Sequence, residues 1–194
     1  RVVSEFPESC QTILLEGVTR LAGYQDIAYA AAYLDRLSGV RDIEIKVDGD
    51  GTVTAEAGRQ LALRMSYEDV IRVAQLKSAG DRLGRIRDEV GAKDDEPIVV
   101  VDYLKPGIDE LCSVLPAGLG RSLMALAERQ GWRDRCNFGL HLKSTTVTGY
   151  LRLRLLAGLR RWRRGTFRYS EEQVSIEAWL EDVKATLPLS RALA

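Results

Sequence analysis

The sequence predicts an all-α fold of roughly six helices, with two long helices in the N-terminal half and at most minor extended segments. Apolar residues recur at steps of three and four along most of the chain, which is the period of a helix that buries one side. Only one run, IVVVDYL at 98–104, has the continuous apolar character of a buried strand, and one strand cannot build a sizeable sheet. The 194 residues fall within the usual size of a single domain, so we expect one helical domain over 1–194.

The first long helix is predicted over about 8–37. Pro7 suits the position where a helix begins, and Gly39 suits its C-terminal end, since glycine adopts the left-handed conformation without a Cβ penalty. One side of this helix gathers the apolar and small residues Ile13, Leu14, Gly17, Val18, Leu21, Tyr24 and Ala28. The following stretch alternates Ile43, Ile45 and Val47 before a turn at 48–51, which allows a hairpin; we favour a surface connection.

A second long helix is predicted from Thr54, as its N-cap, to about residue 90, with Gly80 and Gly84 as weak points. The dipeptide at 96–97, Glu-Pro, ends the helical pattern. The apolar run at 98–104 then allows two interpretations, a buried strand or a packed crossing segment.

The C-terminal half predicts shorter helices. Two of them cover 108–114 and 118–130, separated by Pro116, and the second ends before Gly131. Residues 144–146 predict the cap of a further helix that runs to about residue 163. Ser170 with Gln173 forms a capping-box pattern for a last helix that ends near residue 188.

Charge and hydropathy exclude several broad classes of protein. Lys plus Arg and Asp plus Glu are equal at 28 each, so the overall field does not favour nucleic acid or an anionic membrane. No apolar run approaches the ~18 residues that cross a bilayer, and the opening RVVSEFPESC lacks the pattern of a signal peptide and an initiator Met. We therefore expect a cytoplasmic fragment of a longer subunit, without a membrane partner.

The cysteines and the histidine predict no metal or cofactor site within this chain. Cys10, Cys112 and Cys136 are widely spaced, and none belongs to a C-x-x-C pair. Three thiols cannot form a four-thiolate iron–sulfur cluster, and a zinc site would need carboxylates to complete it. We interpret the cysteines as small buried hydrophobes and the single histidine, His141, as a hydrogen-bonded structural residue.

Two glycine-containing segments resemble ligand loops but lack the required residues. The segment DGDG at 48–51 lacks the Gly at position six and the acid at position twelve of a calcium loop, because Val53 and Arg59 occupy those positions. The segment AGLGR at 117–121 lacks the G-K-[ST] end of a phosphate loop. We predict a turn for the first segment, and the start of a closely packed helix for the second.

The densest charged segment is LRLRLLAGLRRWRRGTFR at 151–168. As a helix it would gather Val147, Leu151, Leu155, Leu159 and Trp162 on one apolar side, and would spread arginines over the other. Three interpretations are open: a solvated face that pairs with carboxylates of the same domain, a contact surface for an acidic partner or another domain, and a nucleic-acid site, which the balanced overall charge disfavours. The candidate contact residues are Arg160, Arg161, Arg163 and Arg164.

A second candidate site combines tyrosines with charged residues. If the two long helices pack together, phenol and carboxylate groups would satisfy one another in a polar seam, where an arginine would neutralise an acid. Its members are Tyr24, Asp26, Tyr67, Glu68, Asp69 and Arg72. We expect Tyr67 or Asp69 to be buried, and we interpret the seam as structural. The alternative is a stand-alone enzyme in which Asp26, Glu68 and Arg72 act on a small molecule.

Several segments together resemble one known family. They are YQDIAYAAAYLDRL, MSYEDVIRVAQLK, YLKPGIDE, LPAGLGR and TTVTGYLRLRLLAGLRRWRR. They resemble successive segments of the helical region of indolepyruvate ferredoxin oxidoreductase beta-type subunits, in the 2-oxoacid ferredoxin oxidoreductase family. The resemblance covers almost the whole chain.

The resemblance implies a parent enzyme that oxidatively decarboxylates aryl pyruvates to acyl-coenzyme A and passes the electrons to ferredoxin. It implies thiamine diphosphate and iron–sulfur clusters in other domains or in the partner subunit, and a glycine-rich α/β domain that this sequence lacks. The chain itself is then expected to be a non-catalytic scaffolding or interaction domain without a cofactor. Its expected partners are the other domains or subunits of the parent oxidoreductase.

Overall fold

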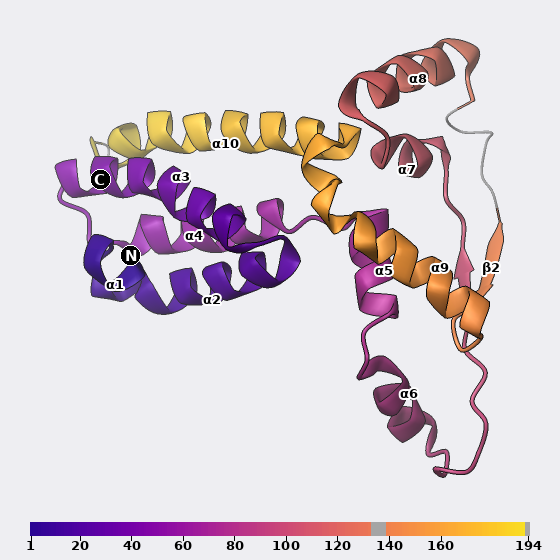
Figure 1. Ribbon diagram of the computed structural model, residues 1–194. Helices are drawn as coiled ribbons and strands as arrows, with labels where there is room; N and C mark the ends of the chain where they lie inside the picture. Colours follow the sequence, from indigo (N-terminus) through magenta and orange to yellow (C-terminus); the bar gives the residue numbers. More distant parts are fainter. Residues whose placement is uncertain (133–138, 193–194) are drawn as a thin grey trace. The chain divides into compact units, whose positions relative to one another are not determined.

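The computed structural model describes residues 1–132 and 139–192, and these residues confirm the mainly all-α fold. The described chain forms ten α-helices and one two-stranded antiparallel sheet (Figure 1). Its contacts group it into two compact units, the first made of Arg1–Tyr67 with Glu171–Ala194 and the second of Glu68–Ser170. The assignment of 1–194 to a single domain stays a prediction. No helix among the described residues has the combined length and apolarity needed to cross a bilayer.

The first unit is a helical bundle. Its helices are α1 (Val2–Glu5), α2 (Glu8–Tyr24), α3 (Ile27–Lys46), α4 (Thr52–Met65) and most of α10 (Phe167–Ala192). Helices α2, α3 and α4 pack on one another, and α10 is joined to α3 by ion pairing and hydrogen bonds from Arg36 to Glu177 and Gln173. The side chains at the centre of the bundle are Cys10, Leu14, Leu21, Leu37, Leu61, Met65, Ile176 and Leu180, all at most 1 % exposed.

Two glycines let one tyrosine cross the centre of this bundle. A Cβ on Gly17 of α2 would lie 2.5 Å from the hydroxyl of Tyr33, and a Cβ on Gly58 of α4 would lie 3.0 Å from it. The Tyr33 hydroxyl donates to the carbonyl oxygen of Gly58 at 3.0 Å, so its buried donor is satisfied. Burial, with a smaller effect from Cys10, raises the pKa of this phenol, which stays neutral at physiological pH.

The prediction of one helix over 8–37 was wrong, because the chain breaks after Tyr24. Asp26 begins a new helix, since its Oδ1 accepts a hydrogen bond from the backbone amide of Tyr29 at 2.8 Å. Helix α3 then continues past Gly39 to Lys46, so neither the predicted end at Gly39 nor the extended or surface connection at 41–47 is correct. Buried residues at steps of three and four, Leu37, Val40 and Glu44, explain why the helix continues.

A buried carboxylate closes the turn between α3 and α4. Glu44 is 1 % exposed, and its side chain accepts hydrogen bonds from the backbone amides of Gly51, Val53 and Thr54 at 3.2, 3.0 and 2.8 Å, and from the Thr54 hydroxyl at 2.6 Å. A residue of one helix therefore satisfies the free amides at the start of the next. The turn predicted at 48–51 is confirmed, with Gly51 at φ 92°, and Gly51 rather than Thr54 precedes the helix.

The prediction of one helix over 54–90 was also wrong, because three helices occupy this range. Helix α4 ends at Met65, α5 covers Val70–Lys77 and α6 covers Arg82–Val90. Asp69 begins α5, and its Oδ1 accepts from the backbone amide of Arg72 at 2.6 Å. The second break, after Lys77, contains Gly80, as expected of a weak point, whereas Gly84 lies inside α6.

The second unit contains the small sheet. Strand β1 (Val101–Leu104) pairs antiparallel with β2 (Leu140–Lys143), with Val101 opposite Lys143. The strand interpretation of the 98–104 run is therefore confirmed. The two predicted helices that follow are confirmed as α7 (Ile108–Ser113) and α8 (Ala117–Gln130). Gly120 packs closely, since a Cβ there would lie 2.4 Å from the Cβ of Phe167, which confirms the predicted close packing at Gly120, whereas a Cβ on Gly118 would meet nothing within 4 Å.

The arginine-rich segment ends its helix earlier than predicted. Helix α9 (Val147–Gly158) begins at Thr146, whose hydroxyl accepts from the Gly149 amide at 3.1 Å. Two short 3-10 turns follow, η1 (Leu159–Arg161) and η2 (Arg163–Gly165).

The predicted capping box of the last helix was wrong. Thr166 caps α10, because its hydroxyl accepts from the Tyr169 amide at 3.2 Å, while the Ser170 hydroxyl donates to the Phe167 carbonyl at 2.9 Å. Pro188 lies inside α10 rather than at its end.

The substitution Glu44→Gln tests the joint between α3 and α4. The neutral amide keeps the size of the side chain but loses the charge that strengthens four hydrogen bonds, and its NH₂ group faces donors. We expect the free energy of unfolding, measured by urea denaturation, to fall by about 3 kcal/mol. The exposed Glu16→Gln is the matched control and should stay within ~0.5 kcal/mol of the native chain. Equal stability of the two variants would reject the structural role of Glu44.

Candidate functional site

The most buried ionic contact of the second unit joins the start of α5 to the arginine-rich turns after α9. Arg163 is 1 % exposed, and its Nε and Nη2 donate to Oδ2 and Oδ1 of Asp69 at 2.7 and 3.1 Å. This two-point geometry matches the fork of a guanidinium to a carboxylate. Because Asp69 also caps α5, one carboxylate holds both the helix start and a chain segment 94 residues away.

The structure divides the predicted polar seam between the two units. In the first unit, the ring of Tyr24 lies 5.8 Å from that of Tyr67 and 6.2 Å from that of Tyr29, measured between centroids. Asp26 of that unit serves as a helix cap. Glu68, Asp69 and Arg72 belong to the second unit, where Asp69 pairs with Arg163.

The burial expected at the seam is confirmed. Tyr67 and Asp69 are each 9 % exposed, whereas Glu68 is exposed. The residues that the stand-alone enzyme alternative needs, Asp26, Glu68 and Arg72, come from both units. The carboxylate of Asp26 already holds a backbone amide. Glu68 lines a cleft of about 450 Å³ in the second unit whose apolar wall includes Val70, Val73, Leu104 and Pro106.

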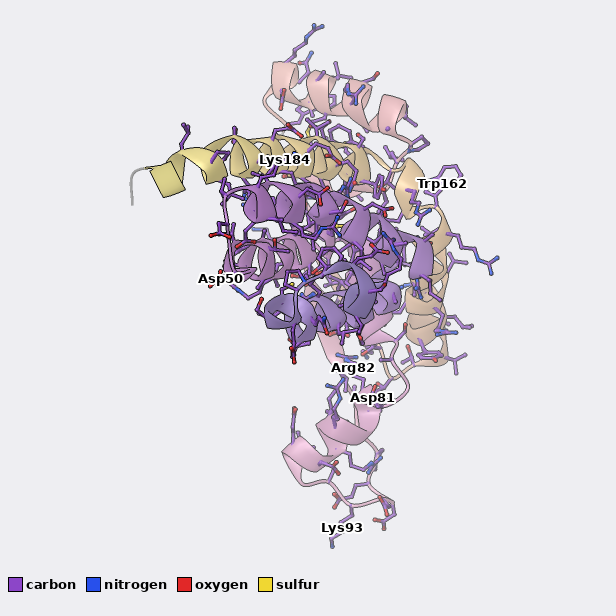
Figure 2. The ribbon with its side chains drawn as sticks, turned by 90° about the vertical axis from the view of Figure 1, so that its left-hand side faces the viewer. Asp50, Asp81, Arg82, Lys93, Trp162 and Lys184 are labelled. Carbon is purple, nitrogen blue, oxygen red and sulfur yellow. The ribbon has the colours of Figure 1, made fainter. Side chains whose placement is uncertain are left out.

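The apolar side predicted for α9 is exposed rather than covered by its own unit. The buried side instead carries Leu153, which is 2 % exposed and packs with Ala74 of α5 and Leu142 of β2. We define the apolar stripe as the exposed residues Val147 (76 %), Leu151 (59 %), Leu155 (75 %) and Trp162 (52 %; Figure 2). Helix α9 therefore has two apolar sides, of which its own unit covers one.

The arginines of this segment divide into one buried residue and several accessible ones. Arg163 was predicted on the accessible side, yet it is among the most buried side chains of the chain. Arg152, Arg154, Arg161 and Arg164 are exposed and Arg160 is half-buried. Residues 139–170 contain eight Lys or Arg and no Asp or Glu, so the neutral overall charge conceals a strongly positive local field.

A second charged cluster, which the sequence did not single out, surrounds Asp102 of β1. This carboxylate is 7 % exposed and accepts from Lys77 Nζ at 2.5 Å and from Arg82 Nη2 at 3.1 Å. Burial by itself raises the pKa of Asp102, but hydrogen bonds from Lys77 and Ser144 and the charges of Arg82 and Lys77 outweigh it, so the pKa lies below its ordinary value. The sequence feature that could have revealed this cluster is the single carboxylate, Asp102, inside the apolar run VVVDYL.

The two described cysteines are buried, whereas His141 is exposed on the small sheet. Cys10 and Cys112 are fully buried, which confirms their interpretation as small hydrophobes, and burial raises the pKa of both thiols. Cys136 lies outside the described residues. His141 of β2 stacks edge-on against Tyr103 of β1, with ring centroids 4.7 Å apart. The part of the chain that the structure describes contains no group of three or more His, Cys, Asp and Glu arranged to hold a metal.

The substitution Asp102→Asn tests the cluster through its dependence on pH. Because the folded-state pKa is lowered, the ionised carboxylate contributes its full stability above the ordinary value near ~4 and loses it as the pH falls through the folded value. We therefore expect the stability difference between the native chain and Asp102→Asn, measured by urea denaturation, to be largest above pH ~5 and to shrink toward pH ~3. The exposed Asp88→Asn should show no such dependence. A difference that grows on acidification would contradict the assignment.

Comparison with known proteins places the chain in a family. A family of unknown function, DUF6537, matches residues 10–193. No curated protein and no solved structure matches the chain. The match therefore covers nearly all of α2 and every later helix, the small sheet, the apolar stripe and the arginine-rich turns, whereas α1 lies before it. On this evidence of nearly complete coverage, the chain belongs to the DUF6537 family of unknown function.

Proposed function

We propose that this chain is a non-catalytic interaction domain of an indolepyruvate-type 2-oxoacid ferredoxin oxidoreductase. The sequence resemblance described above supports the choice of parent enzyme. In this proposal, other domains or subunits of the cytoplasmic parent hold the thiamine diphosphate and the iron–sulfur clusters. The same domains or subunits are the partners of this chain. The observation that carries the interaction role is the apolar stripe.

The stripe has the properties of a contact surface. Leu151 and Leu155 expose more than half of their side-chain area, and covering a side chain of this size contributes about 1.5–3 kcal/mol. A partner that covers the stripe gains this term, whereas water does not.

Arginines border the stripe on both sides. At roughly 100° per residue, Arg152 and Arg154 lie to either side of the line through Leu151 and Leu155. Both arginines are exposed, and neither has a hydrogen bond or an ion pair with a described residue. A cationic border of this kind steers association toward an acidic partner and adds specificity at the rim. Arg161 and Arg164, exposed beside Trp162, extend the same surface.

The buried carboxylates support a structural rather than a catalytic role. Glu44 holds the start of α4, Asp69 holds α5 and Arg163, and Asp102 holds Lys77 and Arg82. Each is occupied by partners that the fold needs, so none is available as a general base without disrupting a helix start or an ion pair.

Two other functions follow from particular features. Glu68 on the 450 Å³ cleft favours a small-molecule enzyme, for which a ligand screen should raise the melting temperature. The cationic stretch at 139–170 favours a nucleic-acid module, for which binding of RNA or DNA should fall steeply with salt.

Co-purification with the remaining parts of the oxidoreductase tests the interaction role. We expect the variant Leu151→Asp with Leu155→Asp to bind those parts at least about tenfold more weakly, because two carboxylates would have to be buried against the partner. The control Val174→Asp changes an equally exposed residue, 71 % exposed, of the first unit and should bind like the native chain.

A second variant tests the charge at the border of the surface. Arg161→Glu with Arg164→Glu should weaken the same association, and the loss should diminish at high salt. Circular dichroism confirms that each variant is folded. Native-like association of both folded variants would overturn the proposed contact surface.

A further inference from the structure

A second cleft of the Glu68–Ser170 unit lies beside the ends of α5 and α9, which pack against each other (Figure 1). Its volume is about 310 Å³, within the range of small-molecule sites. It is distinct from the cleft that Glu68 lines. Two arginines, one amide and several small residues form it: Arg154, Arg160, Gln75, Ser78, Ala79, Gly80, Ala157 and Gly158.

The charged groups on this cleft are guanidinium groups. Arg154 is exposed and makes no hydrogen bond or ion pair with a described residue, and Arg160 lines the same cleft from η1. Each guanidinium offers several donors in a fixed plane, which suits the oxygens of a phosphate better than those of a neutral ligand. No carboxylate is among the residues that line this cleft.

The neighbouring elements reinforce the positive potential. The stretch that supplies Arg154 and Arg160 contains no carboxylate from residue 139 to residue 170. Helix α5 likewise contains no carboxylate, and its Lys77 is paired with Asp102 of β1. Asp69, which precedes that helix, is neutralised by Arg163. An anion entering the cleft therefore meets the guanidinium of Arg154, which no described carboxylate neutralises, within a segment that itself contains no acid.

Gln75 adds a polar group that the fold leaves unsatisfied. Its Oε1 is buried and has no hydrogen-bond partner among the described residues. Rotation of the amide exchanges its carbonyl and NH₂ ends, so the side chain can accept from a hydroxyl or donate to an oxyanion. A Cβ on Gly80 or on Gly158 would meet no heavy atom within 4 Å, so open space adjoins the backbone there.

We propose that this cleft binds the phosphate group of a small phosphate monoester. Arg154 and Arg160 contact the phosphate oxygens, and the Gln75 amide satisfies its buried polar atom on the phosphate or on an adjacent hydroxyl of the ligand. The volume exceeds that of one phosphate ion, which leaves space for part of the esterified group. The cleft shares no residue with the apolar stripe, although Arg154 borders the stripe as well as lining the cleft.

The test is an NMR titration of the native chain at constant ionic strength with three probes: inorganic phosphate, glycerol 3-phosphate and a 12-nucleotide single-stranded DNA. We expect both small phosphates to shift the backbone amides of Gly80 and Gly158 and the side-chain amide of Gln75 in a saturable manner. Arg154→Gln should weaken this binding about tenfold, since a charge-assisted contact is lost. Its exposed position keeps the variant folded, and Arg160→Gln should act in the same direction.

Arg152→Gln is the matched control, because Arg152 lies on the same helix, is exposed, and does not line the cleft. It should bind both small phosphates like the native chain. Equal weakening by Arg152→Gln and Arg154→Gln would overturn the proposal, since the response would then report the general field. Absence of saturable shifts with both small phosphates, or a response confined to the DNA, would overturn it as well.

Discussion

The buried pair of Asp69 and Arg163 is the interaction on which the second unit depends. Two hydrogen bonds join the Arg163 guanidinium to the Asp69 carboxylate. Asp69 also accepts a hydrogen bond from the backbone amide of Arg72 and so holds the first turn of α5. Removing one partner would leave a buried charge uncompensated, which costs about 3–5 kcal/mol in comparable pairs. The pair also determines which arginine is withdrawn from solvent. With Arg163 fixed inward, its neighbours Arg161 and Arg164 stay accessible beside Trp162.

Carboxylates hold the starts of three helices of this chain, α3, α4 and α5. Asp26 and Asp69 begin helices by accepting backbone amides in their own first turns, whereas Glu44 reaches from one helix to the start of the next. A helix start concentrates unsatisfied amides and partial positive charge, so an acidic side chain there gains both hydrogen bonds and a favourable dipole. Of the two acids that suggested chemistry in the sequence, Asp26 is thus used by the backbone, whereas Glu68 is exposed.

The sequence was sufficient for the class of fold and for several local features. The helical period, the glycine at residue 131 and the apolar run before residue 105 predicted helices and one strand correctly. The breaks in the two long helices were missed because Asp26 and Asp69 were assigned to a polar seam, although aspartate before an apolar periodic segment is also a capping signal. Strand β2 was missed because four residues are too short for a periodic pattern to emerge.

Other features depend on contacts between residues far apart in the chain, and a local sequence pattern does not predict them. The pairing of Asp69 with Arg163 spans 94 positions, and no single-sequence pattern selects one arginine among the seven of 151–168. Helix α9 presents two apolar sides, and which of them is buried depends on the shape of α5 rather than on its own periodicity. The two clefts depend on tertiary packing, and only the positive charge beside the second cleft was visible in the sequence, through the absence of acids in 139–170.

We propose that the side of α9 left exposed by its own chain is covered when the chain assembles with the other parts of the proposed parent oxidoreductase. Hydroxyl-radical footprinting with mass spectrometry measures this directly at Leu151, Leu155 and Trp162, with Leu83 and Val174 as exposed references. We expect strong labelling of the three stripe residues in the isolated chain and marked protection in the assembly, with the references unchanged. Equal labelling of the stripe in both states, or protection already present in the isolated chain, would contradict it.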